Sequence, residues 1–285
     1  MTNSKDIVLI TGVSTGMGKA TAAHLAKTGA TVVILCRNKE RGEKALIDIK
    51  TESGNNAIDL FICDLGNMAS IRKFVEAFKV KYTKLNVLIN NAGVILPSRH
   101  ETSDGYELQF GVNHLGPFLL TNLLLDTIVN SAPARIINVA SGAHKIGKIH
   151  FQDVNLKNNY NLIKAYSQSK LCNILFSYEL SERLKGSKVT VNCLHPGAVA
   201  TEMGINRKTG FGATMTRMLK PFFQTPLEGA STAIYLATSE EVSGITGKYF
   251  YKKKPIKSSK LSYNKETSKK LWKLSEELVD LNSDT

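Results

Sequence analysis

The chain has 285 residues, of which 42% are hydrophobic, and a formal net charge of +13. This length and apolar content allow one large buried core, so we expect a single domain over residues 1–285. The first apolar run, residues 7–10, is short and leads directly into a glycine-rich loop, and no later stretch is long and uncharged enough to cross a bilayer. We therefore expect a cytoplasmic protein with neither a signal peptide nor a transmembrane segment.

Short β-branched runs alternate with longer segments of helical spacing along most of the chain. The predicted strands are residues 7–11, 31–36, 57–63, 87–90, 136–140 and 189–194. The predicted helices are residues 18–28, 39–51, 68–82, 105–129 and 167–185. Continuous apolar strands separated by helices indicate a parallel sheet that is covered on both faces. The predicted fold class is α/β, a doubly wound Rossmann-type sheet with a C-terminal helical extension.

The alternation of strands and helices lapses after Pro196. Residues 209–224 are rich in Gly, Thr and Met, and we interpret residues 198–225 as a mobile substrate lid whose apolar side chains include Met215, Met218, Leu219, Phe222 and Phe223. A helix is then expected at 226–238, a last strand at 247–251, and an amphipathic helix at 265–281 with an apolar stripe of Leu271, Leu274, Leu278 and Leu281.

The positive charge is concentrated in the C-terminal part of the chain. Residues 248–273 contain ten lysines and one acid, Glu266, so this stretch contributes +9. No nucleic-acid-binding motif or aromatic stacking platform accompanies the lysines. We interpret residues 252–285 as a basic extension with a solvated face and expect no specific nucleic-acid partner; weak contact with nucleic acid or anionic lipid is the alternative.

The cysteines do not form a recognisable site. They lie far apart inside apolar runs, without a CxxC pair and without His or Cys at zinc-ligand spacing, at Cys36, Cys63, Cys172 and Cys193. We expect buried reduced thiols and no metal site.

The loop after the first predicted strand has the composition of a phosphate-binding turn. It reads Thr11-Gly12-Val13-Ser14-Thr15-Gly16-Met17-Gly18, and a helix follows at once. Glycine suits a tight turn whose backbone approaches a pyrophosphate, and the helix N-terminus offers free N–H groups. We expect a dinucleotide to bind at Gly12, Ser14, Thr15, Gly16, Met17 and Gly18. A tight βα turn without a ligand is the alternative.

A tyrosine and a lysine one helical turn apart can carry acid–base chemistry. Tyrosine is a poor base at pH 7 unless a nearby cation lowers its pKa from about 10. The spacing occurs three times, at Tyr160 with Lys164, Tyr166 with Lys170 and Tyr249 with Lys253. Tyr249 falls in a predicted strand and Tyr160 in an Asn-rich stretch before the helix, whereas Tyr166 and Lys170 share one face of a predicted helix.

The ordered motifs of the chain resemble those of the short-chain dehydrogenase/reductases. The glycine spacing matches that family's TGxxxGxG, and the YxxSK form matches residues 166–170. The other family motifs follow in order at Asp64-Leu65, Asn90-Asn91-Ala92-Gly93, Asn113, Ser141 and Pro196-Gly197. The resemblance covers nearly the whole chain and implies hydride transfer between a nicotinamide and an alcohol or carbonyl.

The resemblance also implies roles for individual residues. Tyr166 would be the proton donor, Ser141 would hold the substrate oxygen, and Asn113 would join a proton relay through water and Lys170. Contacts to the cofactor are implied for Asp64 at the adenine, Asn91, Ala92 and Gly93 beneath the nucleotide, Lys170 at the ribose, and also for Leu65, Tyr166, Pro196, Gly197 and Thr201.

The end of the second predicted strand indicates the choice of cofactor. An Asp or Glu there would bind the ribose 2′-hydroxyl of NAD, but this chain has Cys36-Arg37. An arginine offers a planar, bidentate partner to a 2′-phosphate. We therefore expect NADP rather than NAD; an arginine that only caps the strand in solvent is the alternative.

Several features resemble the retinol dehydrogenase-like branch of the family. Ser141 and Tyr166 are separated by a long connection, and the chain carries Cys36-Arg37-Asn38, Leu194-His195-Pro196-Gly197 and a terminal Leu271-Trp272 helix. The expected substrate is a lipophilic aldehyde, ketone or alcohol. The alternative function is a catalytically silent NADP-binding sensor or interaction protein. We expect packing or hydrogen-bonding roles for His114, His144 and His195, and the oligomeric state stays open.

Overall fold

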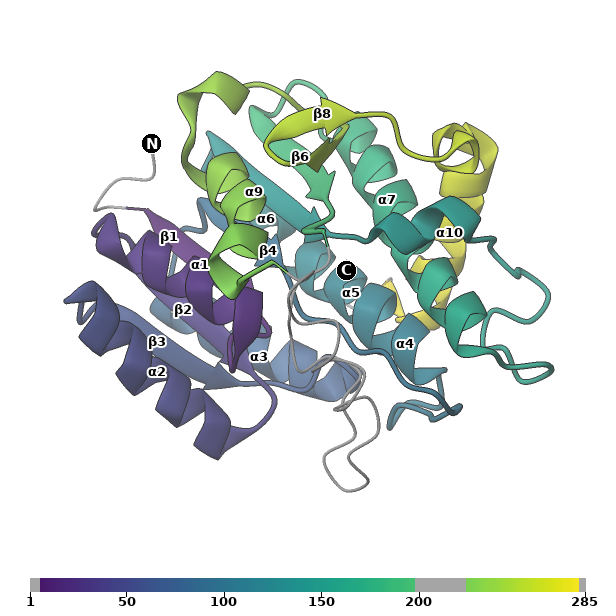
Figure 1. Ribbon diagram of the computed structural model, residues 1–285, viewed down its shortest axis with the longest axis horizontal. Helices are drawn as coiled ribbons and strands as arrows, with labels where there is room; N and C mark the ends of the chain where they lie inside the picture. The colour runs from purple at the N-terminus through teal and green to yellow at the C-terminus, as the bar shows by residue number, and fades with distance from the viewer. Residues whose placement is uncertain (1–5, 198–223, 282–285) are drawn as a thin grey trace.

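A computed structural model describes residues 6–197 and 224–281 of the chain. These residues form an eight-stranded sheet with the order β3-β2-β1-β4-β5-β6-β7-β8 (Figure 1). The strands are β1 Ile7–Thr11, β2 Thr31–Cys36, β3 Ile58–Ile62, β4 Val87–Asn90, β5 Ala134–Val139, β6 Val189–Leu194, β7 Lys248–Tyr251 and β8 Lys254–Ile256. The strands from β1 to β7 pair in parallel, so their carboxyl ends meet at one edge. The predicted doubly wound sheet is confirmed.

Helices cover both faces of the sheet. Their bounds are α1 Gly16–Lys27, α2 Lys39–Ser53, α3 Met68–Lys81, α4 Leu108–Phe110, α5 Gly116–Leu123, α6 Leu125–Asn130, α7 Leu162–Arg183, α9 Pro226–Thr238 and α10 Lys265–Leu278. Side chains of β1 alternate between the faces, because Val8 and Ile10 join the core under α1 and α9, whereas Leu9 joins the core under α3, α5 and α7. Continuous apolar strands are therefore needed to fill both cores.

The helix predicted at residues 105–129 is interrupted in the structure. It begins at Leu108, passes through a π-helical turn, Gly111–Leu115, and breaks again at Leu124. The π turn contains Asn113, whose side chain bonds to the backbone of Val94 instead of facing solvent. Such turns accommodate one extra residue and often lie at functional sites.

The C-terminal part of the chain joins the fold more closely than its composition suggests. Strand β8, which we did not predict, pairs antiparallel with β7 through a turn at Lys252 and Lys253. Both turn residues have positive φ, 48° and 63°, as in two-residue type I′ hairpins. Helix α10 packs along α7 and buries Leu271 and Trp272 (Figure 1).

The length and composition of the helices decide whether one of them could cross a membrane. Among residues 6–197 and 224–281, none of the helices combines the length and the apolar character that a bilayer crossing requires. The segment 198–225 that we interpret as a lid lies almost entirely outside the described residues, so its interpretation stays a prediction.

A buried histidine connects α10 to the π turn. The ring of His114 is 1% exposed and lies against Phe110 and Phe118. Its Nε2 donates to the Ser275 hydroxyl at 2.9 Å, since that hydroxyl already donates to the Leu271 carbonyl. Burial lowers the pKa of His114 to about 3, so the folded protein holds this ring neutral.

His114 should make the protein less stable in acid. Its unfolded pKa is about 6.5, so between pH 6.5 and about 3 the unfolded chain binds a proton that the folded protein does not. The free energy of unfolding is unaffected by this titration above pH 6.5. Below pH 6.5 it falls by about 1.4 kcal/mol per pH unit as the pH decreases. His114→Gln keeps a donor for Ser275 and removes this titration. Urea unfolding measures the free energy of unfolding from pH 7 to 4. Its dependence on pH should correspond to about one proton fewer in the variant than in the parent, and equal slopes would contradict the assignment.

Candidate active site

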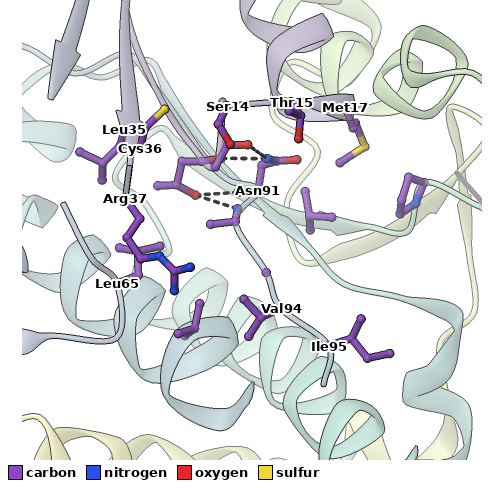
Figure 2. A pocket seen from close by; sticks show the side chains of 18 of the residues that line it. Ser14, Thr15, Met17, Leu35, Cys36, Arg37, Leu65, Asn91, Val94 and Ile95 are labelled. Atoms are coloured by element: carbon purple, nitrogen blue, oxygen red, sulfur yellow. Dashed lines mark hydrogen bonds between the residues drawn. The ribbon is translucent and has the colours of Figure 1, made fainter. Parts of the chain in front are cut away.

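A cleft of about 710 Å³ opens at the carboxyl ends of the parallel strands. Most residues predicted from the sequence line it, namely Gly12, Ser14, Thr15, Met17, Gly18, Arg37, Asp64, Leu65, Asn91, Ala92, Gly93, Ser141, Tyr166, Lys170, Pro196 and Gly197. Figure 2 shows how side chains from the loop after β1, from β2 and from the loop after β4 surround it. Gly16 belongs to the same loop as these glycines and has φ +61°. Asn113 is hydrogen-bonded to the backbone of Val94. Thr201 is outside the described residues.

Glycine is required in the first loop because two backbones meet there. A Cβ on Gly12, which has φ +71°, would lie 2.7 Å from the Ala92 Cα. A Cβ on Gly18 would lie 2.4 Å from the Gly12 carbonyl oxygen and 2.5 Å from Asn91 Nδ2. The Asn91 amide donates to the carbonyls of Thr11 and Gly12 at 2.8 and 3.1 Å (Figure 2). Asn91 therefore holds the loop in shape from the neighbouring strand.

The N-terminus of α1 is open toward the cleft. Its N-cap, Thr15, makes no side-chain capping bond within the described part of the chain. In contrast, Asn38, Asn67 and Asn161 each accept a hydrogen bond from the first turn of α2, α3 and α7. Uncapped N–H groups and the positive end of the helix dipole form a site for an anion. This arrangement fits the pyrophosphate of a dinucleotide.

Two arginines lie at the end of β2. Residues 36–38 are Cys, Arg and Asn, so this strand end supplies no carboxylate for a ribose hydroxyl. Arg37 and Arg41 both line the cleft, and Arg41 stands in the first turn of α2. We did not predict Arg41 from the sequence, although a second basic residue one turn after Arg37 was a usable signal. The strand end fits a ligand with an additional phosphate.

The helix α7 carries Tyr166 and Lys170 into the cleft. The side chain of Asn161 caps this helix by accepting from the amides of Ile163 and Lys164. Lys170 is 2% exposed; its Nζ lies 5.6 Å from the centre of the Tyr166 ring and donates to the Val139 carbonyl at 3.1 Å. The other two tyrosines of the same spacing are elsewhere, Tyr160 before α7 begins and Tyr249 in β7.

Burial dominates the electrostatics of this pair. It lowers the pKa of Lys170 to about 8 and raises the pKa of Tyr166, while a hydrogen bond from Ser141 acts on Tyr166 in the opposite direction. The expectation that Lys170 lowers the pKa of Tyr166 is therefore wrong for this structure. The lysine is bonded to the Val139 carbonyl, and the loss of water around the phenol outweighs the remaining influences.

Ser141 and Asn113 approach the pair from different sides. Ser141 follows β5 and caps a short 3₁₀ helix, Gly142–Ile146, by accepting from the Ala143 amide at 3.2 Å. Asn113 donates to the Val94 carbonyl and to the Ser169 hydroxyl, both at 3.0 Å. A Cβ on Gly93 would lie 3.4 Å from both Asn113 Oδ1 and Lys170 Nζ. The structure thus places Asn113 beside Lys170, and its part in a proton relay stays a prediction.

Comparison with known protein families gives a consistent result. Residues 6–210 match the family model for short chain dehydrogenases. The chain is 43% identical to retinol dehydrogenase 12 of Mus musculus over 275 residues, covering 96% of this chain and 86% of that protein. It is 44% identical to retinol dehydrogenase 13 of Homo sapiens over 281 residues, covering 96% and 84%.

Solved structures share the fold. An uncharacterized protein from Mycobacterium paratuberculosis superposes with a TM-score of 0.77 and 31% identity, covering 97% of this chain and 94% of that one. A short chain dehydrogenase from Shigella flexneri complexed with NADP gives a TM-score of 0.70 and 22% identity, covering 88% and 98%. With the glycine loop, Ser141, Tyr166 and Lys170 gathered around one cleft, the chain belongs to the short-chain dehydrogenase/reductase family, in its retinol dehydrogenase-like branch.

Proposed function

We propose that this oxidoreductase transfers a hydride between NADP(H) and an alcohol or carbonyl group of a lipophilic small molecule. One observation carries the proposal: a single continuous cleft joins the glycine loop and the two arginines to Ser141, Tyr166 and Lys170. The nicotinamide, when bound, supplies or accepts the hydride. The chain's own groups then have to bind the dinucleotide, orient the substrate oxygen and move one proton.

The proton is assigned to Tyr166. In reduction its hydroxyl donates to the carbonyl oxygen, and in oxidation the phenolate accepts the proton of the alcohol. Ser141, which is hydrogen-bonded to Tyr166, holds the same oxygen from the other side. Lys170, with a pKa of about 8, is mostly protonated at pH 7.

The cofactor preference is assigned to Arg37 and Arg41. A 2′-phosphate at the end of β2 would meet two guanidinium groups and no carboxylate from residues 36–38. A planar guanidinium can donate two parallel hydrogen bonds to a phosphate. NADP(H) gains these contacts and NAD(H) cannot.

The substrate class is assigned from the wall of the cleft and from the relatives. Val94, Ile95 and Leu96 line the cleft with apolar side chains. Relatives that are 43 to 44% identical carry the name retinol dehydrogenase. We propose that the substrate is a lipophilic aldehyde, ketone or alcohol.

We also propose that the enzyme is cytoplasmic. The four free and buried cysteines support this localisation.

Gly18→Ala should weaken binding of NADPH by about tenfold or more, because the added Cβ would collide with the Gly12 carbonyl and with Asn91 and would displace the loop. Titration of NADPH fluorescence measures the Kd. Gly142→Ala is the control, since a Cβ there meets no described atom within 4 Å. An unchanged Kd in Gly18→Ala would show that the loop does not hold the cofactor.

Arg37→Ala should reduce the preference for NADPH over NADH by about tenfold to hundredfold, since a hydrogen bond to a charged group contributes about 1.5 to 3 kcal/mol. Arg41→Ala should act in the same direction, and addition of Cys36→Asp should move the preference toward NADH. The measurement is the ratio of kcat/KM for the two cofactors. Lys44→Ala removes a charge from the exposed side of α2 and should leave the ratio unchanged. A parent enzyme that prefers NADH would overturn the assignment.

Tyr166→Phe should lower kcat by about two or more orders of magnitude while NADPH still binds, because acid–base assistance contributes about that much. Lys170→Ala should lower kcat and also weaken the binding of NADPH. The assay follows NADPH consumption with a panel of lipophilic aldehydes and ketones. Tyr106→Phe, which removes a phenol bonded to the Leu278 carbonyl, is the control. NADPH binding without turnover in the parent, and no change in Tyr166→Phe, would favour a silent sensor.

A further inference from the structure

A buried histidine lies between the strand end that carries Ser141 and the C-terminal segment. His144 is fully buried in the 3₁₀ helix that follows Ser141. Its Nδ1 is 2.7 Å from the Ser141 carbonyl oxygen, and its Nε2 is 3.1 Å from the Ser259 amide nitrogen. The sequence suggested a packing or hydrogen-bonding role for His144 and a peripheral position for the segment that contains Ser259. Neither suggestion connected the two.

The partners of His144 define its protonation. A carbonyl oxygen only accepts, so Nδ1 donates to Ser141; an amide N–H only donates, so Nε2 accepts from Ser259. The ring is therefore neutral with its proton on Nδ1. Burial lowers the pKa of His144, in agreement with a neutral ring. Both ring nitrogens are used: Nδ1 faces the Ser141 carbonyl, with the Tyr249 hydroxyl oxygen 3.5 Å away, and Nε2 faces the Ser259 amide.

The segment around Ser259 is itself fixed to the catalytic helix. Tyr178 of α7 bonds through its hydroxyl to the Ser258 hydroxyl at 2.8 Å. The Ser258 amide donates to the Tyr263 hydroxyl at 3.1 Å, and the rings of Tyr178 and Tyr263 stack with centres 5.4 Å apart. The Ser259 amide is thus held relative to α7, the helix that also carries Tyr166.

We propose that His144 is a positioning residue that ties the backbone of Ser141 to the C-terminal segment and thereby sets the distance between Ser141 and Tyr166. The chain of contacts runs from α7 through Tyr178 to Ser259, then through His144 to Ser141. These contacts therefore connect Ser141 to the helix that carries Tyr166, and these are the two residues proposed to hold the substrate oxygen. The inference rests on the proposed function, because it gives Ser141 and Tyr166 a shared task.

The Ser259 position allows a substitution that removes one N–H group. Its φ of −65° equals the value that proline imposes, so Ser259→Pro suits the backbone. It replaces the N–H that His144 accepts from by a ring methylene, which also displaces the imidazole from this position. The Ser259 hydroxyl oxygen is buried and has no hydrogen-bond partner among the described residues. Ser259→Ala is therefore a matched control that removes the same hydroxyl and keeps the N–H.

We expect Ser259→Pro to lower kcat by about tenfold or more, because small misplacements of orienting groups have large effects on rate. The Kd for NADPH should not change, since His144 and Ser259 do not line the cleft. Ser259→Ala should retain the parent kcat. Equal kcat values for Pro, Ala and the parent would overturn the proposal.

A double-mutant cycle with Ser141→Ala separates positioning from general stability. If His144 acts through Ser141, Ser259→Pro should have little further effect on kcat once the Ser141 hydroxyl is gone. A merely structural role would lower kcat by the same factor in both backgrounds and would overturn the proposal. If Ser259→Pro does not fold, His144→Phe enters the same cycle. Its control is then Thr232→Val, which removes the bond from the Lys253 amide to the Thr232 hydroxyl on α9.

Amide hydrogen exchange tests the same contact without a substrate. The amides of Ala143 and His144 donate to the Ser141 hydroxyl and carbonyl. They should exchange faster in Ser259→Pro than in Ser259→Ala, and equal rates would overturn the proposal. A parent enzyme without activity on any carbonyl would remove the proposed function, whereas the exchange rates would still decide whether His144 holds Ser141 in place.

Discussion

The loops that follow β1 and β4 hold each other through hydrogen bonds between backbone and side chain. The Thr11 hydroxyl accepts from the amides of Asn91 and Ala92 at 3.0 and 2.9 Å, and the Asn91 side chain returns two bonds to the carbonyls of Thr11 and Gly12. This contact requires the absence of a Cβ at Gly12 and Gly18. It sets the start of α1 relative to the loop that passes in front of Lys170. The start of α1 and the loop that contains Gly93 are therefore positioned by one junction between neighbouring strands.

The sequence predicted the sheet well because its signals are local. Each strand from β1 to β6 is a short apolar run, and both faces of the sheet are covered, so the runs stand out without knowledge of the tertiary structure. The π turn at Gly111–Leu115 could not be predicted in this way, since it depends on the bonds of Asn113 to Val94. Strand β8 was missed because Lys252 and Lys253 lack the Asn-Gly signature of a hairpin.

The residues that line the cleft were predictable to a similar extent. Residue types and order were enough to select Ser141, Tyr166 and Lys170, which the fold brings to one cleft. The direction of the pKa of Tyr166 was not predictable, because it depends on how completely water is excluded from the phenol. Arg41 was not predicted because it lies in the first turn of α2, one turn beyond the strand end that indicates the cofactor. Residues 198–223, including Thr201, lie outside the described residues.

Lys170 near Gly93 and Arg37 at the end of β2 differ in how far mobile ions can approach them. Lys170 is 2% exposed, and a Cβ on Gly93 would lie 3.4 Å from its Nζ. Its charge lies in a medium that mobile ions do not enter, so added salt hardly screens it. Arg37, in contrast, lines the cleft with an exposed side chain. Added salt therefore screens the charge of Arg37 far more than the charge of Lys170.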